Sequence, residues 1–494
     1  MPKVSFRMAS ASLWELIETY WQDLLQVVLS VRAGVLSSAL LSRKLGTYRR
    51  RNHLYQASRR RVAYTAGVIA YPTLPLPRFF RVHQALPTDR VPDVPAAVRE
   101  ALDAAGLAER LPPGASVAIT AGSRGIASIP IVVRSVVDYV RALGCEPFVV
   151  PAMGSHGGAT PEGQRHVLAE YGITEQSVGA PIRATMDTVQ LGQLPSGAGV
   201  HFDANAAGAD ATVVVNRVKA HTAFRGEIES GLCKMTAIGL GKQAGAEQAH
   251  AHGLRETIPA AAALSLERAN VVAGVALVEN AAHELAIVRG VRPQDFLSAD
   301  RELLRAANEF LPRVPFDHLH LLVVGWLGKN LSGSGIDYNV VGMWRRIGGE
   351  PVPNFERIAV LDITEESDGN GLGVGIADFT TERLLGKLDR QKMYMNGLTA
   401  NALAAIKIPP ALESDRQAME VALHSVGHSA DARIAVVRNT LELDELWVSE
   451  ALSEEVSRSP RLSVAGPVED LAFSADGRLE IVSSPRPMAH VASM

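Results

Sequence analysis

The densest group of chemically active side chains lies between Lys219 and His252, near the middle of the chain. Its members suit phosphate binding, metal binding or proton transfer: Lys219, His221, Arg225, Glu227, Lys234, Lys242, His250 and His252. Lys234 follows Ser-Gly-Leu-Cys, and small and apolar neighbours favour a nucleophilic amine. His250 and His252 would point in different directions on a helix, so only one of them is expected to bind a given metal ion. Basic residues that hold a phosphate without a metal are the alternative interpretation.

A second candidate is the loop Ala121-Gly-Ser-Arg-Gly-Ile126, which comes where a helix is expected to begin. Its backbone amides, the Ser123 hydroxyl and the Arg124 guanidinium suit a phosphate or a carboxylate. The same residues also fit a helix cap at Ser123 and a surface ion pair at Arg124. The pattern alone leaves both interpretations open.

A third candidate is the loop Met153-Gly-Ser-His-Gly-Gly158. Gly157 and Gly158 would let the backbone approach a ligand closely. His156 could carry protons near neutral pH. A histidine in a glycine turn also serves purely structural roles, so the motif is suggestive rather than specific.

These loops follow predicted strands in a regular alternation of short β-branched runs and amphipathic helices, which is typical of βαβ units. Strands are expected at Ser116 to Thr120, Pro147 to Pro151, Ala211 to Asn216, Val271 to Val278, Leu319 to Val324, Ile358 to Ile363 and Ile434 to Val437. The pattern predicts an α/β fold of two domains, with mostly parallel sheets and helices on both faces. Ligands of such sheets collect at the carboxyl ends of the strands, which would bring the loops together.

The length of 494 residues exceeds what one hydrophobic core usually supports. We expect a helical, basic N-terminal extension at 1–76, a first α/β domain with the three loops at 77–295 and a second α/β domain at 296–430 that closes the active-site cleft. The segment 431–494 is expected to pack back on the first domain. The arginine clusters of the extension indicate a basic surface helix. The alternatives are a solvated extension, or translation begun upstream of the true start.

The overall charge is nearly balanced, with 49 Lys and Arg against 52 Asp and Glu, so no strong field would attract nucleic acid. A small-molecule substrate fits better. The two cysteines, Cys145 and Cys233, are too few for a disulfide framework or a thiolate metal site, which predicts a cytoplasmic protein. Charges interrupt every apolar run of the N-terminal extension, so no transmembrane segment is expected.

From roughly Pro77 to Ala430, the chain resembles the lactate racemase family, whose members carry a nickel pincer nucleotide attached to a lysine. The family's small-residue segment ending in that lysine looks like Glu229-Ser-Gly-Leu-Cys-Lys234. The nickel-binding histidine follows about four helical turns later, which matches His250. The resemblance makes 77–295 the cofactor-binding catalytic domain, with Ser123, Gly157 and Gly158 as further cofactor contacts. Cofactor-synthesis proteins are then expected partners.

The resemblance also implies a reaction, the inversion of a hydroxyl-bearing carbon by hydride transfer to and from the cofactor. Two groups must then exchange the hydroxyl proton, one on each side of the substrate. His156 looks like one acid/base and His221 like the other. Arg124 would bind the substrate carboxylate or a neighbouring polar group.

Several residues depart from the family pattern. Ala121 and Ser123 stand where better-known members have an aspartate and a threonine, and His283 stands where a lysine faces the active site. His221 lies farther before Lys234 than in the lactate enzymes, so His283 is the alternative second acid/base. These departures argue against lactate itself and favour another 2-hydroxy acid or a related compound. The run from Gly328 to Asn339 resembles a segment of divergent members and would supply polar side chains to the cleft.

Three other functions compete with this interpretation. A metal-dependent hydrolase would need a carboxylate ligand at suitable spacing, which the histidine cluster lacks. A nicotinamide dehydrogenase would need a GxGxxG turn between a strand and a helix, which the chain lacks. A non-catalytic protein that binds or carries the nucleotide cofactor would keep Lys234 and His250, but it would not need His156 or His221.

Overall fold

The computed structural model describes residues 73–123 and 125–483. The chain divides into one unit at Met1–Tyr71 and a second at Pro72–Met494. The expected N-terminal extension up to residue 72 and the side chain of Arg124 therefore lie outside the described residues. In the part that is described, no helix is both long and apolar enough to cross a membrane.

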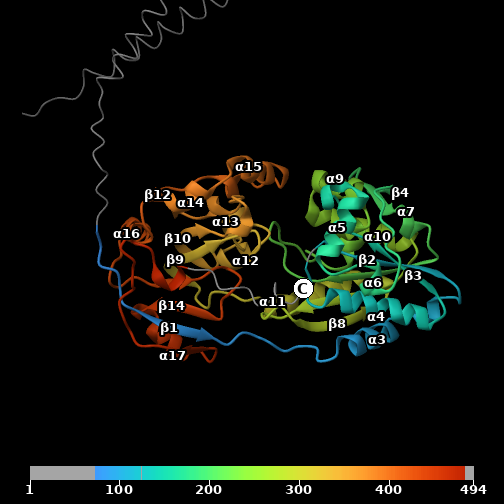
Figure 1. Ribbon diagram of the computed structural model, residues 1–494, viewed down its shortest axis with the longest axis horizontal. Helices are drawn as coiled ribbons and strands as arrows, with labels where there is room; N and C mark the ends of the chain where they lie inside the picture. The colour runs from blue at the N-terminus through green and yellow to red at the C-terminus, as the bar shows by residue number, and fades with distance from the viewer. Residues whose placement is uncertain (1–72, 124, 484–494) are drawn as a thin grey trace, which may run out of the picture. The chain divides into compact units, whose positions relative to one another are not determined.

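The first of the two large sheets has five strands in the order β3-β2-β6-β7-β8, of which Figure 1 labels β2, β3 and β8. Their bounds are β2 Ser116–Ala121, β3 Glu146–Pro151, β6 Ala211–Arg217, β7 Val271–Glu279 and β8 Leu285–Val291. All neighbours are parallel except β7 and β8. A separate antiparallel pair consists of β4 (Thr188–Gln193) and β5 (Gly199–Asp203). It lies beside α9 (Lys242–His252) and α10 (Leu254–Arg268).

Both faces of the five-stranded sheet are covered by helices because its strands are apolar on both sides. Along β6, Val213 and Val215 belong to a core with α3 and α4, whereas Val214 belongs to a core with α10 and α11. The helices of this half are α3 Val94–Ala104, α4 Ile129–Ala142, α5 Pro161–Glu170, α8 Leu232–Lys234, α9 Lys242–His252, α10 Leu254–Arg268 and α11 Phe296–Phe310, with shorter α6 Glu175–Val178 and α7 Ala204–Ala207.

The second large sheet has eight strands in the order β12-β11-β10-β9-β13-β14-β1-β15. Their bounds are β1 Phe79–Gln84, β9 His318–Leu327, β10 Asn354–Ile363, β11 Phe379–Thr381, β12 Ala411–Leu412, β13 Ile434–Val437, β14 Glu445–Ser449 and β15 Leu462–Val464. The strands from β12 to β13 are parallel, and the last three pair antiparallel. Around it lie α12 Tyr338–Val341, α13 Trp344–Ile347, α14 Glu382–Lys387, α15 Arg390–Thr399, α16 Asp415–Val426 and α17 Ser453–Arg458.

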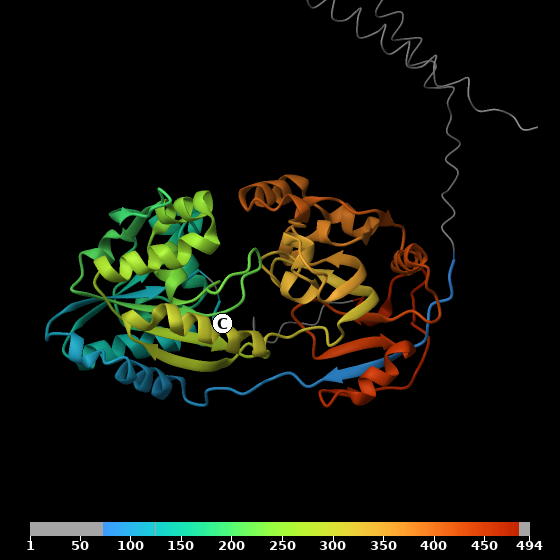
Figure 2. The same ribbon diagram turned by 180° about the vertical axis from the view of Figure 1, so that it is seen from behind.

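The fold class is therefore α/β, as expected, and each strand expected from the sequence is present. The order of the chain through the sheets differs from the expectation in two places. β1 belongs to the eight-stranded sheet although it comes first in the chain, and Figure 2 shows it in blue beside the red C-terminal strands. The described part of the C-terminal segment, 431–483, supplies β13, β14 and β15 to that same sheet, whereas the sequence predicts that the segment 431–494 packs on the first domain. Antiparallel pairing between strands so far apart along the chain leaves no local pattern in the sequence.

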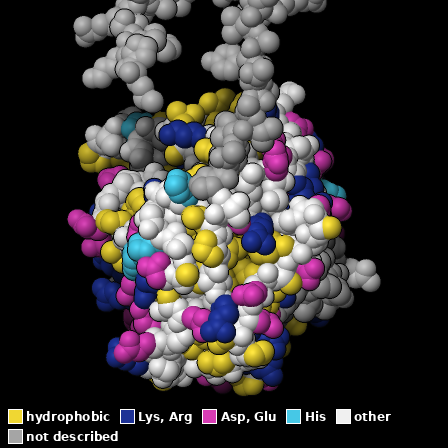
Figure 3. All heavy atoms as spheres, turned by 90° about the vertical axis from the view of Figure 1, so that its left-hand side faces the viewer, with side chains coloured by type: hydrophobic (Ala, Val, Ile, Leu, Met, Phe, Trp, Pro, Cys, Tyr) yellow, Lys and Arg dark blue, Asp and Glu magenta, His cyan; other side chains and the backbone are white. Residues whose placement is uncertain are grey.

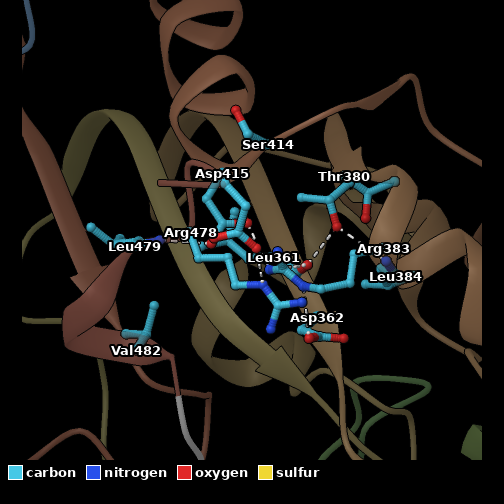
Figure 4. Close-up of polar contacts among 12 residues, drawn as sticks. Leu361, Asp362, Thr380, Arg383, Leu384, Ser414, Asp415, Arg478, Leu479 and Val482 are labelled. Carbon is cyan, nitrogen blue, oxygen red and sulfur yellow. Dashed lines mark hydrogen bonds and ion pairs between the residues drawn. The ribbon is translucent and has the colours of Figure 1, made fainter. Parts of the chain in front are cut away.

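A buried ionic cluster fastens the C-terminal segment to the eight-stranded sheet (Figure 4). Arg383 donates from Nε to Asp362 Oδ2 at 2.9 Å and from Nη2 to Asp415 Oδ1 at 2.7 Å. The backbone amide of Leu479 donates to the other oxygen of Asp415 at 2.9 Å. Burial raises the pKa of Asp415, and the Leu479 amide and Arg383 oppose that rise.

On the molecular face in Figure 3, acidic and basic side chains are interspersed, in keeping with the balanced charge.

Candidate active site

Three loops that carry expected site residues leave the same edge of the five-stranded sheet. β3, β2 and β6 are parallel neighbours, so the loops that begin after Ala121, Pro151 and Arg217 start side by side. This edge is the carboxyl end of the strands, where α/β proteins bind ligands. The topology thus brings together the regions of Ser123, His156 and His221.

The helical segment that begins at Leu232 and contains Lys234 packs against two of these loops. A Cβ atom on Gly122 would lie 3.1 Å from Met235 Cε, and one on Gly239 would lie 2.8 Å from the carbonyl oxygen of Ala152. Gly154 also donates its amide hydrogen to the carbonyl of Gly239 at 3.2 Å. Residues Met235–Gly239 form a turn of π-helix, a variant often found at functional sites. Small residues thus allow backbone-to-backbone contact around Lys234.

The start of this segment is fixed by Asp300, which lies on α11. Its carboxylate accepts hydrogen bonds from the amides of Leu232 at 3.1 Å and Cys233 at 2.8 Å. Gly231 has φ +111°, and a Cβ atom there would lie 2.3 Å from Asp300 Oδ1, so only glycine fits. Asn216, at the end of β6, donates to the Gly231 carbonyl at 2.7 Å. The half-buried Lys234 thus follows a rigid turn.

The same surroundings keep Cys233 unreactive. Burial raises the pKa of its thiol, and the carboxylate of Asp300 raises it further. A thiol that stays protonated is neither a nucleophile nor a metal ligand at neutral pH. With Cys233 protonated, Lys234 is the remaining candidate nucleophile of this turn.

His250 lies in the last turn of α9, close enough to Lys234 for the charge of the lysine to affect the pKa of its ring. Although the residue is exposed, the protein around the ring lowers its pKa by desolvation, and the Lys234 ammonium lowers it further. The structure therefore brings these two residues into one neighbourhood. His252 behaves differently, because its Nδ1 contacts the Gln248 carbonyl at 3.0 Å and its Nε2 lies 3.8 Å from where a Cβ of Gly197 would be.

His156 and Ser123 connect two of the loops. The Ser123 hydroxyl contacts Nδ1 of His156 in a short hydrogen bond. Gly157 packs against α5, where a Cβ atom would lie 2.5 Å from the carbonyl carbon of Gly163. Gly158, at φ +64°, has open space where a Cβ would be. Of the two glycines, Gly158 is thus the one with room for a ligand beside it.

His221 is held in a fixed tautomer by its own loop. Its Nδ1 accepts the amide hydrogen of Ala223 at 3.0 Å, so in the neutral ring the proton resides on Nε2. The His221 amide donates to Glu229 Oε2 at 2.7 Å. Glu229 is buried and also accepts from Gly226 and Arg225. The loop thereby presents His221 as a donor through Nε2.

Arg225, in the same loop, also hydrogen-bonds to Asn339 of α12. Asn339 belongs to the glycine-rich run 328–339 expected to supply polar groups to the cleft. The other polar residues of that run have partners in their own half of the chain. Lys329 donates to Asn396 at 2.9 Å, Asn330 accepts from Thr364 at 2.7 Å and Asp337 accepts from Asn339 at 2.8 Å.

His283 lies beyond the end of β7 and interacts with Glu279. Burial alone would raise the pKa of Glu279, but the charge of Arg217, the amide of Ala127 and, more weakly, His283 together lower it. Glu279 accepts the Ala127 amide hydrogen at 2.6 Å and so supports the first loop. His283 itself has φ +59°, an unusual backbone conformation for a histidine.

The sequence did not single out the buried cluster behind the His156 loop. Lys242 is fully buried, and its Nζ lies 2.9 Å from Asp203 Oδ2, without hydrogen-bond geometry, and 3.0 Å from Gln164 Oε1. The amide of Gln164 donates to the carbonyls of Gly154 at 2.9 Å and His156 at 3.3 Å. Asp203 and Gln164 are both distant from Lys242 along the chain, so no local pattern could reveal the cluster. It links α9, which carries His250, to the loop of His156.

Comparisons with known proteins give three findings. A family model described as a domain of unknown function (DUF362) matches residues 118–297, and one for the Tn3 transposase DDE domain matches residues 5–65. No curated protein matches the chain. Among solved structures, the chain is similar to the lactate racemase apoprotein from Thermoanaerobacterium thermosaccharolyticum, with 12% identity and a TM-score of 0.43, over 74% of this chain and 98% of that one.

Proposed function

We propose that this chain is a nickel-pincer-nucleotide-dependent racemase or epimerase. It would invert a hydroxyl-bearing carbon of a 2-hydroxy acid or a related compound. The observations that support the proposal are the closeness of His250 to Lys234, whose charge lowers the pKa of the imidazole, and the shared edge of the sheet where the loops of His156 and His221 begin. A lysine for covalent attachment, a histidine for the metal and two histidines for proton transfer match the needs of that reaction.

The donor chemistry of the site suits the cofactor. Desolvation, the larger cause, lowers the pKa of His250 and keeps its imidazole neutral near pH 7, the form that binds metal. The Lys234 ammonium adds to this effect only until the lysine is linked to the cofactor and loses its charge. Nickel accepts imidazole ligands readily. Lys234 would hold the cofactor covalently, and Ser123 and Gly158 would line its surroundings. The chemistry that the bound cofactor would supply is reversible hydride acceptance.

The chain's own residues would handle the proton. Neutral His221 carries its proton on Nε2 and would hydrogen-bond the substrate oxygen with it. To act as an acid it would take up a second proton on Nδ1, giving up the Ala223 contact, and the imidazolium would then donate from Nε2. His156, whose Nδ1 is engaged by Ser123, would use Nε2 to remove the hydroxyl proton in the same direction of reaction. The roles exchange when the reaction runs backwards. Substrate carboxylate binding by Arg124 remains part of the proposal, as do a cytoplasmic location and cofactor-synthesis proteins as partners.

Peptide mapping of protein made together with the cofactor-synthesis proteins tests the proposal. We expect about one cofactor-bound nickel per chain and a cofactor mass adduct on the peptide with Lys234. Lys234→Ala should abolish the adduct, and the matched variant Lys219→Ala should keep it. An adduct on Lys219 or Lys242 would contradict the assignment, and no adduct would contradict the function. The loaded protein is then incubated with 2-hydroxy acids and sugar acids in deuterated solvent to identify the substrate by its epimerisation.

A further inference from the structure

Three side chains of metal-ligand type lie together on the eight-stranded sheet. His318 and His320 alternate with Leu319 at the start of β9, so they share one face of the strand. Glu356 lies on β10 between Phe355, which pairs with Leu319, and Arg357, which pairs with Leu321. It therefore lies next to His320 across the two parallel strands. These positions are at the amino ends of β9 and β10, on a different sheet from the candidate active site.

The distances suit a single ion. Nε2 of His318 lies 2.8 Å from Oε1 of Glu356, and Nε2 of His320 lies 4.0 Å from the same oxygen. One ligand atom from each residue lies within 4.8 Å of the others. Ligand atoms around a tetrahedral zinc ion are roughly 3.3 to 3.6 Å apart, since each lies about 2.0 to 2.2 Å from the metal. Small side-chain adjustments would bring the three atoms to those separations.

The surroundings leave the cluster accessible. The side chain of His320 is 10% exposed and forms the floor, whereas those of His318 and Glu356 are 41% and 32% exposed. The ring of His428 stacks on His320 with centroids 3.7 Å apart, and His428 in turn contacts Asp431. A neighbouring positive charge, Arg433, is paired with Glu455 at 2.8 Å. Glu356 is thus the carboxylate that would balance the charge of an entering ion.

One contact must change when an ion binds. Nδ1 of His320 accepts the amide hydrogen of Arg433 at 3.1 Å. A neutral imidazole that binds a metal through Nε2 carries its proton on Nδ1, so the ring must turn away from that amide. Binding through His320 therefore loses one hydrogen bond, whereas His318 and Glu356 exchange only the contact between them. His320 should be the weakest of the three ligands.

We propose that His318, Glu356 and His320 form a binding site for one divalent transition ion of the zinc type. Nitrogen from two histidines and oxygen from one carboxylate is a donor set that zinc, cobalt and nickel accept. The open side of the cluster leaves room for water to complete the coordination. The site is separate from Lys234 and His250, so it does not depend on the proposed function.

The test is a cobalt titration of the full chain, made without the cofactor-synthesis proteins and treated with chelator. We expect the visible absorption of tetrahedral Co²⁺ to saturate at one ion per chain and to disappear when Zn²⁺ is added. His318→Ala and Glu356→Gln should each weaken Co²⁺ binding by at least tenfold, and His320→Ala by less. His424→Ala, which removes an exposed histidine of α16, should leave the titration unchanged.

A melting experiment keeps the test valid if a variant folds poorly. An ion that binds only the folded protein raises its melting temperature. Zn²⁺ should therefore raise the melting temperature of the wild type and of His424→Ala but not that of Glu356→Gln. A wild type that binds Co²⁺ no more tightly than His318→Ala would overturn the proposal. Equal losses in all three ligand variants would overturn the ranking of His320.

Discussion

The carboxylate of Asp300 accepts the amide hydrogen of Cys233 at 2.8 Å, immediately before Lys234 in the chain. Asp300 belongs to α11, far along the chain from the turn that it holds. Leu232 also donates to this carboxylate, and the carboxylate occupies the space that a side chain at Gly231 would need. The position of Lys234 therefore depends on a group that is itself fully buried. The pH dependence of the free energy of unfolding should therefore reveal the ionisation of Asp300.

Asp300→Asn should change how stability depends on pH. Burial raises the pKa of Asp300 to about 6, well above the value of about 3.9 in an unfolded chain. Between these two values the folded state retains a proton that the unfolded state has released. The stability that Asp300 contributes is therefore complete below pH 4, is lost as the pH rises to about 6 and stays constant above that. The loss amounts to about 1.4 kcal/mol per unit of pKa difference.

Urea unfolding between pH 4 and 7 measures this effect. The asparagine variant should be the less stable protein at pH 4, because it loses one of the two amide contacts, and the difference should shrink or reverse by pH 7. Asp295→Asn, which alters an exposed aspartate nearby, is the control and should follow the wild type. Parallel curves for Asp300→Asn and the wild type would contradict the buried, protonated carboxyl group.

The sequence could predict those parts of the fold that have a local pattern. β6 reads as a run of β-branched residues because both of its faces are buried, and the helix that follows Ser128 has regular apolar spacing. Because loops after neighbouring parallel strands begin at the same edge of a sheet, the predicted strands also place the loops of Ser123, His156 and His221 at one edge. Asp300 and the pairing of β1 depend on contacts across long sequence separations, which no local pattern encodes.

Lys242→Met should destabilise the protein strongly. The change removes the buried ammonium and leaves the carboxylate of Asp203 buried without its ion pair. Breaking a buried pair in this way typically costs about 3 to 5 kcal/mol. Urea unfolding should show a loss of that order, and the double variant with Asp203→Asn should recover part of it, since the asparagine can still accept from Ala206. A double variant as unstable as the sum of the singles would show that the pair is not coupled.

His250→Ala should lower nickel retention while leaving the cofactor adduct on Lys234. Covalent attachment and metal binding are separate functions of two residues, so one can be lost without the other. His252→Ala should have much less effect, because its ring is engaged by the Gln248 carbonyl. Nickel is measured in a Glu356→Gln background, which removes the second metal site from the count. Equal nickel losses in the two histidine variants would contradict the assignment of His250 as the nickel ligand.

His156 and His221 provide the sharpest test of catalysis, since a cofactor carrier needs neither and a racemase needs both. General acid/base catalysis contributes about 10²- to 10⁴-fold, so alanine at either position should slow epimerisation by that order in both directions. The double variant should be little slower than the singles, because removing one partner already disables the cycle that the other serves. Rates are normalised to cofactor-bound nickel, which should stay near the wild-type level.

Two further substitutions should separate the roles of His156 and His221. His221 acts through Nε2 while Nδ1 is held by Ala223, so His221→Gln, which keeps a donor near that position, should retain more activity than His221→Ala. Ser123→Ala frees Nδ1 of His156 from its hydroxyl partner and should slow the reaction when the rate is normalised to cofactor-bound nickel. Near-full activity in His221→Ala would show that His221 is not the second acid/base. His283, which interacts with Glu279, would then be the next candidate. Full activity in both alanine variants would exclude the two-histidine mechanism, even if Lys234 still carried the cofactor.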